Sequence, residues 1–113
     1  MADISSDANG NPTLTGSGTE DTLFSALTTA DVYQLHVDLS NMQNGDVIEI
    51  RVSTKVRTGS TAADFGTWVF AHAQANPVWI SPPIPVLFEM NAYATQHLGT
   101  GRAIEWTRVQ YAT

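Results

Sequence analysis

The sequence predicts an all-β protein, an antiparallel β-sandwich or jelly roll of about six to eight strands. Three observations support this fold class. Apolar and polar residues alternate with a period of two over several segments, Thr is abundant while charged residues make up only 14% of the chain, and no ten-residue run shows the spacing of an amphipathic helix. At 113 residues and 42% apolar composition, the chain has the size of a single domain with its own core.

Residues 1–20 are predicted to form a flexible acidic arm that precedes a sandwich domain over residues 21–113. The arm is rich in Gly, Ser, Asn and Asp and contains only isolated apolar residues, so it shows neither a helical nor a strand period. Residues 1–31 carry five acidic residues and no Lys or Arg. Two roles stay open for the arm: a disordered tail, or a segment that orders on a neighbouring subunit.

The clearest strand predictions are residues 32–39 and residues 47–56. In the first, VYQLHVDL, the odd-numbered residues are apolar and share one face, and the second alternates in the same way. The connection between them contains Asn44-Gly45, a strong tight-turn signal. We therefore expect an antiparallel hairpin, with Met42 folding back as a plug.

Further strands are expected over residues 23–27, 65–75, 86–96 and 103–112. The segment 65–75 is apolar on both faces, which is typical of a strand that is covered on both sides or packed against another chain. The segment 81–85 contains three prolines. Because proline cannot donate a ladder hydrogen bond, this segment is predicted to be an edge, a crossing or an extended connection.

The run Gly99-Thr100-Gly101-Arg102 requires a choice between a phosphate-binding loop and a tight turn. A dinucleotide-binding loop needs Gly or Ala at its sixth position and a helix after it, whereas Ile104 occupies that position and a strand pattern follows. We therefore interpret the run as a hairpin turn that feeds the last strand. Arg102 is then available to form an ion pair with a carboxylate on a neighbouring chain or strand.

Composition argues against several classes of function. The chain has no Cys, which removes disulfides, thiol catalysis and the common zinc sites. Its net charge of −6 argues against a nucleic acid or an anionic membrane as partner. No apolar run approaches the ~20 residues that span a bilayer. No secretory signal is visible, so synthesis in a cytoplasm is expected.

No catalytic, cofactor or metal site is predicted. His36 and Asp38 share a strand face at a spacing that suits two metal ligands, but no third ligand is evident, and we interpret both as surface residues. The chain has no Gly-x-Ser-x-Gly elbow. Three glutamates, Glu49, Glu89 and Glu105, are expected on outer faces rather than in one cleft, balanced by Arg51, Lys55 or Arg108. We therefore predict a non-enzymatic protein.

Candidate interface residues are the large or stiff side chains that a small sandwich has limited room to bury. They are Trp68, Phe70, Trp79, Pro82, Pro83, Arg102 and Trp106. Trp79, beside the prolines, is expected nearest to a surface or a subunit contact. An exposed Trp beside Asn, Asp or Gln also suits a carbohydrate-binding module, which stays open as an alternative of another class.

Two stretches carry a resemblance to a known group of proteins. The run YQLHVDLSNMQNGDVIEIRVSTKV and the closing GTGRAIEW resemble small β-sandwich structural proteins encoded in the head-gene clusters of tailed bacteriophages, over Thr19 to Tyr111. The resemblance implies a virion component on the capsid surface, made in the host cytoplasm: a capsid decoration (cement) protein that binds the major capsid protein and forms a homotrimer. A head–tail joining or tail-associated virion protein is the alternative within this class.

Overall fold

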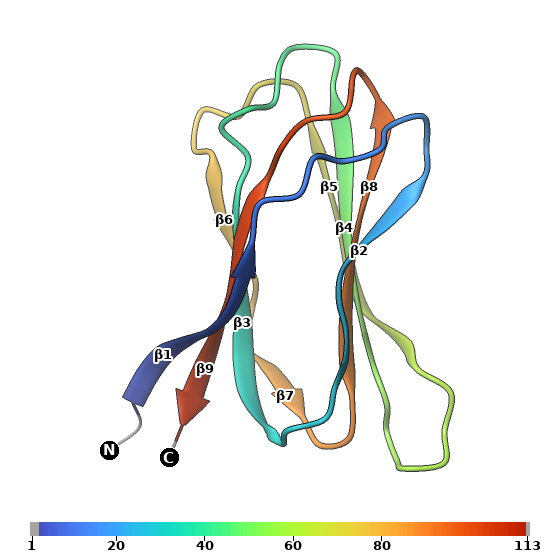
Figure 1. The fold of residues 1–113 in the computed structure, drawn as a ribbon, viewed down its shortest axis with the longest axis vertical. Helices are drawn as coiled ribbons and strands as arrows, with labels where there is room; N and C mark the ends of the chain where they lie inside the picture. The colour runs from blue at the N-terminus through green and yellow to red at the C-terminus, as the bar shows by residue number, and fades with distance from the viewer. Residues whose placement is uncertain (1–2, 113) are drawn as a thin grey trace.

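The computed structural model describes residues 3–112, which form two packed antiparallel β-sheets (Figure 1). The predicted all-β sandwich is confirmed. One sheet has the order β1-β9-β3-β6, with β7 also paired to β3, and the other has the order β2-β8-β4-β5. No helix among the described residues is long and apolar enough to cross a membrane. The strands are β1 (Asp3–Gly10), β2 (Glu20–Leu27), β3 (Asp31–Asp38), β4 (Val47–Thr54), β5 (Ala63–Ala71), β6 (Val78–Ile80), β7 (Ile84–Val86), β8 (Met90–Leu98) and β9 (Glu105–Ala112).

The core lies between the inner faces of the two sheets. Leu35 and Val37 of β3 face Ile48 and Ile50 of β4, and all four are fully buried. Their neighbours in sequence point outward because successive strand residues alternate between faces. The period-two pattern of the sequence is therefore the pattern of burial, and apolar burial of this kind is the main stabilising term of the fold.

The chain changes sheet at most connections, and this overturns the two predicted hairpins. β3 and β4 lie in different sheets, so the Asn44-Gly45 segment arches over the edge of the core. The Gly99–Arg102 segment links β8 to β9 in the same way. The physical reason is that Leu39, Met42 and Ile104 are buried apolar residues that draw these connections across the space between the sheets. The predicted plug, Met42, is confirmed at 2% exposure.

The segment 1–20 differs from the predicted flexible arm wherever the structure describes it. Asp3–Gly10 form β1, which pairs antiparallel with β9. Beyond β1, Leu14 is buried, and its N–H donates to the carbonyl of Arg102 at 2.8 Å. This corrects the prediction. The strand forms despite its weak intrinsic β propensity because β9 offers a free ladder edge and Leu14 anchors the chain behind it.

The proline-rich segment is an interrupted edge, in agreement with the prediction. β6 and β7 both pair with β3, with Pro82 and Pro83 between them. Ser81 fills the gap in the ladder: its hydroxyl accepts the N–H of Leu35 at 2.9 Å, and its own N–H donates to the Leu35 carbonyl at 2.9 Å. The hydroxyl thus takes the place of the Ser81 carbonyl, which accepts a hydrogen bond from the Gln34 side chain instead, and the pairing with β3 is kept up to the prolines.

Candidate interaction surfaces

An ion pair with a buried carboxylate joins two inter-sheet connections at one end of the sandwich. The Nε of Arg102 donates to Asp46 at 2.7 Å, and Asp46 is 1% exposed. The hydrogen bond from Arg102 holds the pKa of Asp46 below its usual value; burial opposes this shift, and the N–H of Gln43 adds to it. We call this pair the clamp. The carboxylate that pairs with Arg102 is therefore that of Asp46, on a neighbouring connection of the same chain.

The glycine run is shaped around the clamp. Gly99 has a φ of +91°, and a Cβ there would lie 1.9 Å from Oδ1 of Asp46. The buried Gln96 side chain donates to the Thr100 carbonyl at 2.7 Å and accepts the N–H of Arg102 at 2.8 Å. The glycine run therefore binds the carboxylate of Asp46 from the same chain. It is followed by strand β9 and not by the helix that a phosphate-binding loop would need.

Three of the seven candidate interface residues pack against one another. The ring centroid of Trp79 on β6 lies 4.9 Å from that of Trp68 and 5.5 Å from that of Phe70, both on β5. β5 and β6 are the outer strands of the two sheets on one side of the sandwich (Figure 1). All three rings are half-buried and pack against the core. They close this side of the sandwich, and the Trp79 ring is already in contact with two others.

The other candidate interface residues are not brought together. Pro82 and Pro83 are exposed between β6 and β7, whereas Arg102 lies at the clamp. Trp106 is only 6% exposed. Its indole covers Gly10 of β1, where a Cβ would lie 2.7 Å from Nε1. The seven residues therefore do not form one surface within a single copy of the chain.

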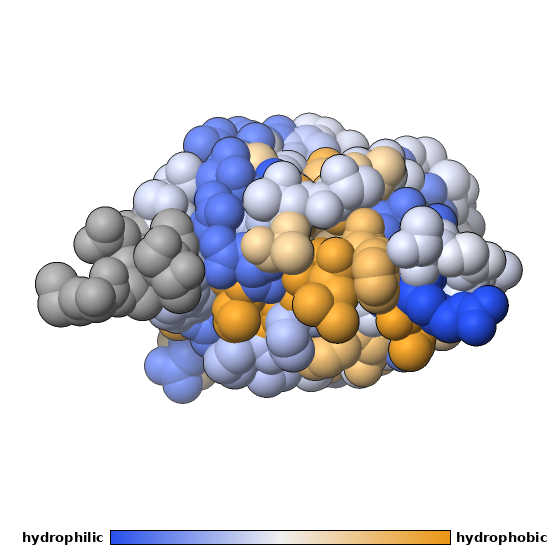
Figure 2. Space-filling view, turned by 90° about the horizontal axis from the view of Figure 1, so that it is seen from below, coloured by the Kyte–Doolittle hydropathy of each residue, from blue (hydrophilic) through white to orange (hydrophobic). Residues whose placement is uncertain are grey.

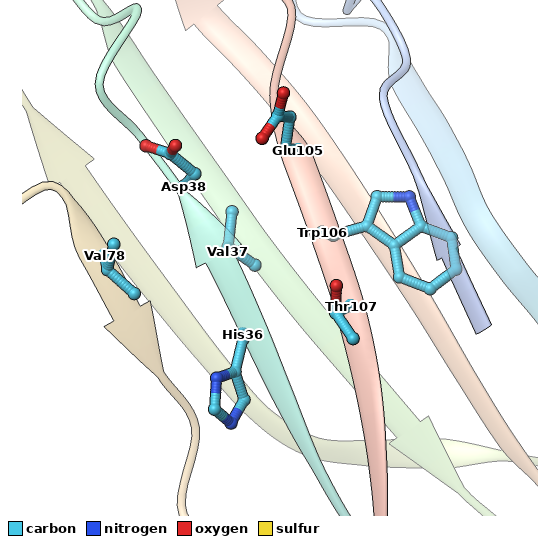
Figure 3. Close-up of a pocket in the computed structure, with 7 residues that line it drawn as sticks. All are labelled: His36, Val37, Asp38, Val78, Glu105, Trp106 and Thr107. Atoms are coloured by element: carbon cyan, nitrogen blue, oxygen red, sulfur yellow. The ribbon is translucent and has the colours of Figure 1, made fainter. Parts of the chain in front are cut away.

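A shallow depression of about 120 Å³ lies between β3 and β9. Figure 3 shows Asp38 and Glu105 side by side, with His36 further along β3. Asp38 and Glu105 are direct partners in the ladder, and His36 is opposite Thr107. Residues 3–112 contain no group of three His, Asp or Glu side chains that could hold a metal ion. The two carboxylates are thus a like-charge cross-strand pair, which costs stability.

Arg108 departs from the expectation that it balances a glutamate on an outer face. Expected on an outer face, it is 9% exposed and shares strand parity with the buried Trp106. Its guanidinium donates to Asp7 of β1 at 2.6 Å and lies 4.5 Å from the ring centroid of Phe24. The sequence did contain a signal for this burial: Arg108 lies two residues after Trp106, so strand alternation places both side chains on the same face. Arg108 links the first strand to the last through a shielded ion pair and a cation–π contact.

Apolar side chains gather at the end of the sandwich that carries the chain termini. Figure 2 views this end and shows a contiguous apolar area in its centre. The connections here carry Val56, Leu87 and Phe88, which are 81%, 68% and 36% exposed. The strand predicted from residue 86 begins at Met90 instead, so Leu87 and Phe88 lie outside the ladder. We call this surface the apolar end; such patches mark interaction sites on soluble proteins.

Solved structures include chains of similar fold. A Bacillus endospore appendage protein, from a family described as disulfide-linked pili, is 17% identical, with a TM-score of 0.55 over 99% of this chain and 90% of that chain. The VP2 subviral particle of infectious bursal disease virus is 13% identical, with a TM-score of 0.46, and this chain spans 33% of it. No family model and no curated protein matches the sequence. At these identities, the likeness to the appendage protein establishes the fold.

Proposed function

We propose that this protein is a non-enzymatic structural subunit of a repetitive assembly, namely a capsid decoration protein on the head shell of a tailed bacteriophage. The observation that carries the proposal is the apolar end, where the exposed side chains of Val56, Leu87 and Phe88 lie on connections at one end of the sandwich. A subunit that docks on a shell needs a surface of this kind. The resemblance to phage head-cluster proteins supports the choice of assembly, with the major capsid protein as partner and a homotrimer as the docked unit.

The charged side chains support a structural role. Arg51 bridges Glu20 of β2 and Asp64 of β5 at 2.9 and 2.7 Å. Arg108 joins β1 to β9, and the clamp joins two connections. These cations are used to tie strands together rather than to line a common cleft. A catalytic site, in contrast, concentrates titratable groups around one reacting position.

Cosedimentation with expanded empty head shells tests the proposal. We expect saturable binding that Leu87→Ser weakens at least about tenfold. Leu98→Ser is the matched control, because Leu98 is similarly exposed, at 60%, but lies at the opposite end of β8. Failure of the unmodified protein to bind shells, or equal loss in both variants, contradicts the decoration role.

A second candidate function is that of an appendage subunit. The likeness to the endospore appendage protein, which extends over 90% of that chain, favours it. Because this chain has no Cys, an appendage built from it would be held by non-covalent contacts. Electron microscopy of the purified protein separates the candidates: filaments favour an appendage, discrete trimers favour decoration, and a ring of higher copy number favours a head–tail joining or tail-associated protein.

A further inference from the structure

The outer strands of the two sheets differ in how well their free edges can accept another strand. β1 pairs regularly from Asp3 to Ser6 and then bulges. The register of β2 shifts twice between Thr22 and Leu27. β6 has three residues and runs into prolines. Bulges, short length and proline are the devices by which proteins protect sheet edges, so these three edges are protected.

β5 is less well protected, because its one register shift lies near the start of the strand, between Asp64 and Gly66. Its register with β4 is unbroken from Gly66 to Ala71, six residues, and β5 contains no Pro, Lys or Arg. Its one acid, Asp64, lies outside that stretch and is neutralised by Arg51 at 2.7 Å. On the outward face, Val69 is 60% exposed. A long, regular, uncharged edge with an apolar outer face is a template for strand addition.

The charge distribution selects the same edge for self-association. A chain of net charge −6 repels its own copies. The β1 edge carries Asp7, and the β2 edge carries Glu20 and Asp21. The stretch 66–71 carries no charge. Acids directly opposite each other on paired strands repel and destabilise the pairing. Two copies that meet along this stretch place no acids opposite each other.

We propose that β5 pairs antiparallel with β5 of a second copy across a two-fold axis, so that two four-stranded sheets become one eight-stranded sheet. The occupant is a second copy because the regular stretch 66–71 matches itself in length and carries no charge that would repel its counterpart. In the register with Val69 on the axis, each Val69 faces the other and Thr67 faces Ala71. The contact is self-complementary, as a two-fold interface requires.

The side chains behind β5 make it ready to pair. Trp68 and Phe70 point inward and are held by Trp79 at ring-centroid distances of 4.9 and 5.5 Å. The edge is therefore fixed before association. A six-residue ladder is only about 20 Å long. The area that it buries is therefore smaller than that of a standard stable interface. We therefore expect a dimer that forms with increasing protein concentration. This inference does not depend on the decoration role.

Sedimentation velocity over about a hundredfold range of protein concentration tests the pairing. We expect a monomer–dimer equilibrium whose midpoint rises at least about tenfold in Val69→Lys, since a charged residue on the edge strand opposes pairing. Leu87→Lys, at the apolar end, is the matched control and leaves the midpoint unchanged. A monomer at all concentrations, or a trimer that Val69→Lys does not affect, overturns the proposal.

Cross-linking gives a second measurement in a chain free of native thiols. Val69→Cys is expected to oxidise to a covalent dimer faster than Leu87→Cys, because only the former places like residues on the two-fold axis. Equal rates overturn the two-fold contact. The two-fold contact is also overturned if the protein forms filaments that Val69→Lys abolishes and Val69→Cys fails to cross-link. That result would indicate head-to-tail pairing of β5. Shell binding by Leu87→Ser is measured separately, so failure of the decoration role and failure of this contact are distinguishable.

Discussion

The two ends of the sandwich are held by different chemistry. At one end, the clamp joins two inter-sheet connections through a buried carboxylate. At the apolar end, the Lys55–Glu89 pair is longer, at 3.5 Å, and nearer the surface, while apolar side chains stay exposed. A buried polar pair fixes one arrangement of its own chain, whereas an exposed apolar surface is free to meet another molecule. The difference indicates which end is structural and which is available for contact.

Removing the clamp carboxylate gives the largest expected effect. Asp46→Ala removes a buried carboxylate that accepts hydrogen bonds from Arg102 and from the N–H of Gln43, so we expect the free energy of unfolding to fall by about 3 kcal/mol. Denaturant unfolding measures it. Glu89→Ala at the apolar end is the control and is expected to cost far less, because the Glu89 carboxylate is nearer the surface than that of Asp46 and its ion pair is longer, at 3.5 Å. Equal losses at the two ends contradict the comparison.

Gly99→Ala is expected to cost about 2–3 kcal/mol. The new Cβ would meet Oδ1 of Asp46 at 1.9 Å, and the residue must also adopt a φ of +91°. Gly45→Ala isolates the second effect, because Gly45 has a φ of +97° with open space around its Cβ position. That variant is expected to lose only about 1 kcal/mol. A Gly99 variant no less stable than the Gly45 variant shows that the clamp can move aside.

The clamp also predicts a pH dependence of stability. Because the pKa of Asp46 is lower in the folded protein than in the unfolded chain, its contribution is fully present above the unfolded pKa of about 3.9. It is lost as the pH falls toward the folded pKa. We expect the stability of the unmodified protein to fall more steeply below about pH 4 than that of Asp46→Asn. Parallel pH profiles from thermal unfolding would assign the acid sensitivity to other carboxylates.

Strand positions were predictable from the sequence, but sheet membership was not. Alternation shows which residues of β3 and β4 face a core, and it is the same whether the next strand lies in the same sheet or the opposite one. Asn44-Gly45 therefore suggested a hairpin where the chain crosses between sheets. β1 was missed because its order comes from β9, a partner about a hundred residues away in sequence. Long-range pairing of this kind leaves no local pattern.

The same limit applies to the candidate sites. The sequence indicated that Arg102 would bind a carboxylate, since an arginine beside a glycine turn is free to reach one, but not that Asp46 would be the partner. Arg108 was placed outside because a charge on an alternating strand is ordinarily solvated. Its burial depends on Asp7 and on the ring of Phe24, both supplied by other strands. Tertiary partners decided each case.

Near the apolar end, Ala26→Gly is expected to raise the free energy of unfolding by about 0.5 kcal/mol. Ala26 has a φ of 56°, a conformation that glycine adopts without steric cost. Its N–H donates to Oδ1 of Asn91 at 2.8 Å, a bond that the variant keeps. The gain is partly offset by the greater flexibility of glycine in the unfolded chain. Thermal unfolding at pH 7 measures it, and a loss of stability would show that the methyl group contributes packing.

The smallest expected effect is that of Leu87→Ser, at less than about 0.5 kcal/mol. Leu87 is 68% exposed and lies outside the strands, so its side chain does little for the fold. Asp46 and Leu87 are therefore opposite cases: one substitution changes stability, and the other changes association. Chemical unfolding of Leu87→Ser tests whether its stability is nearly unchanged, and cosedimentation with shells tests whether its binding is weakened. A loss above about 1 kcal/mol would mean that Leu87 packs within the fold, and the apolar end would no longer be a surface left free for a partner.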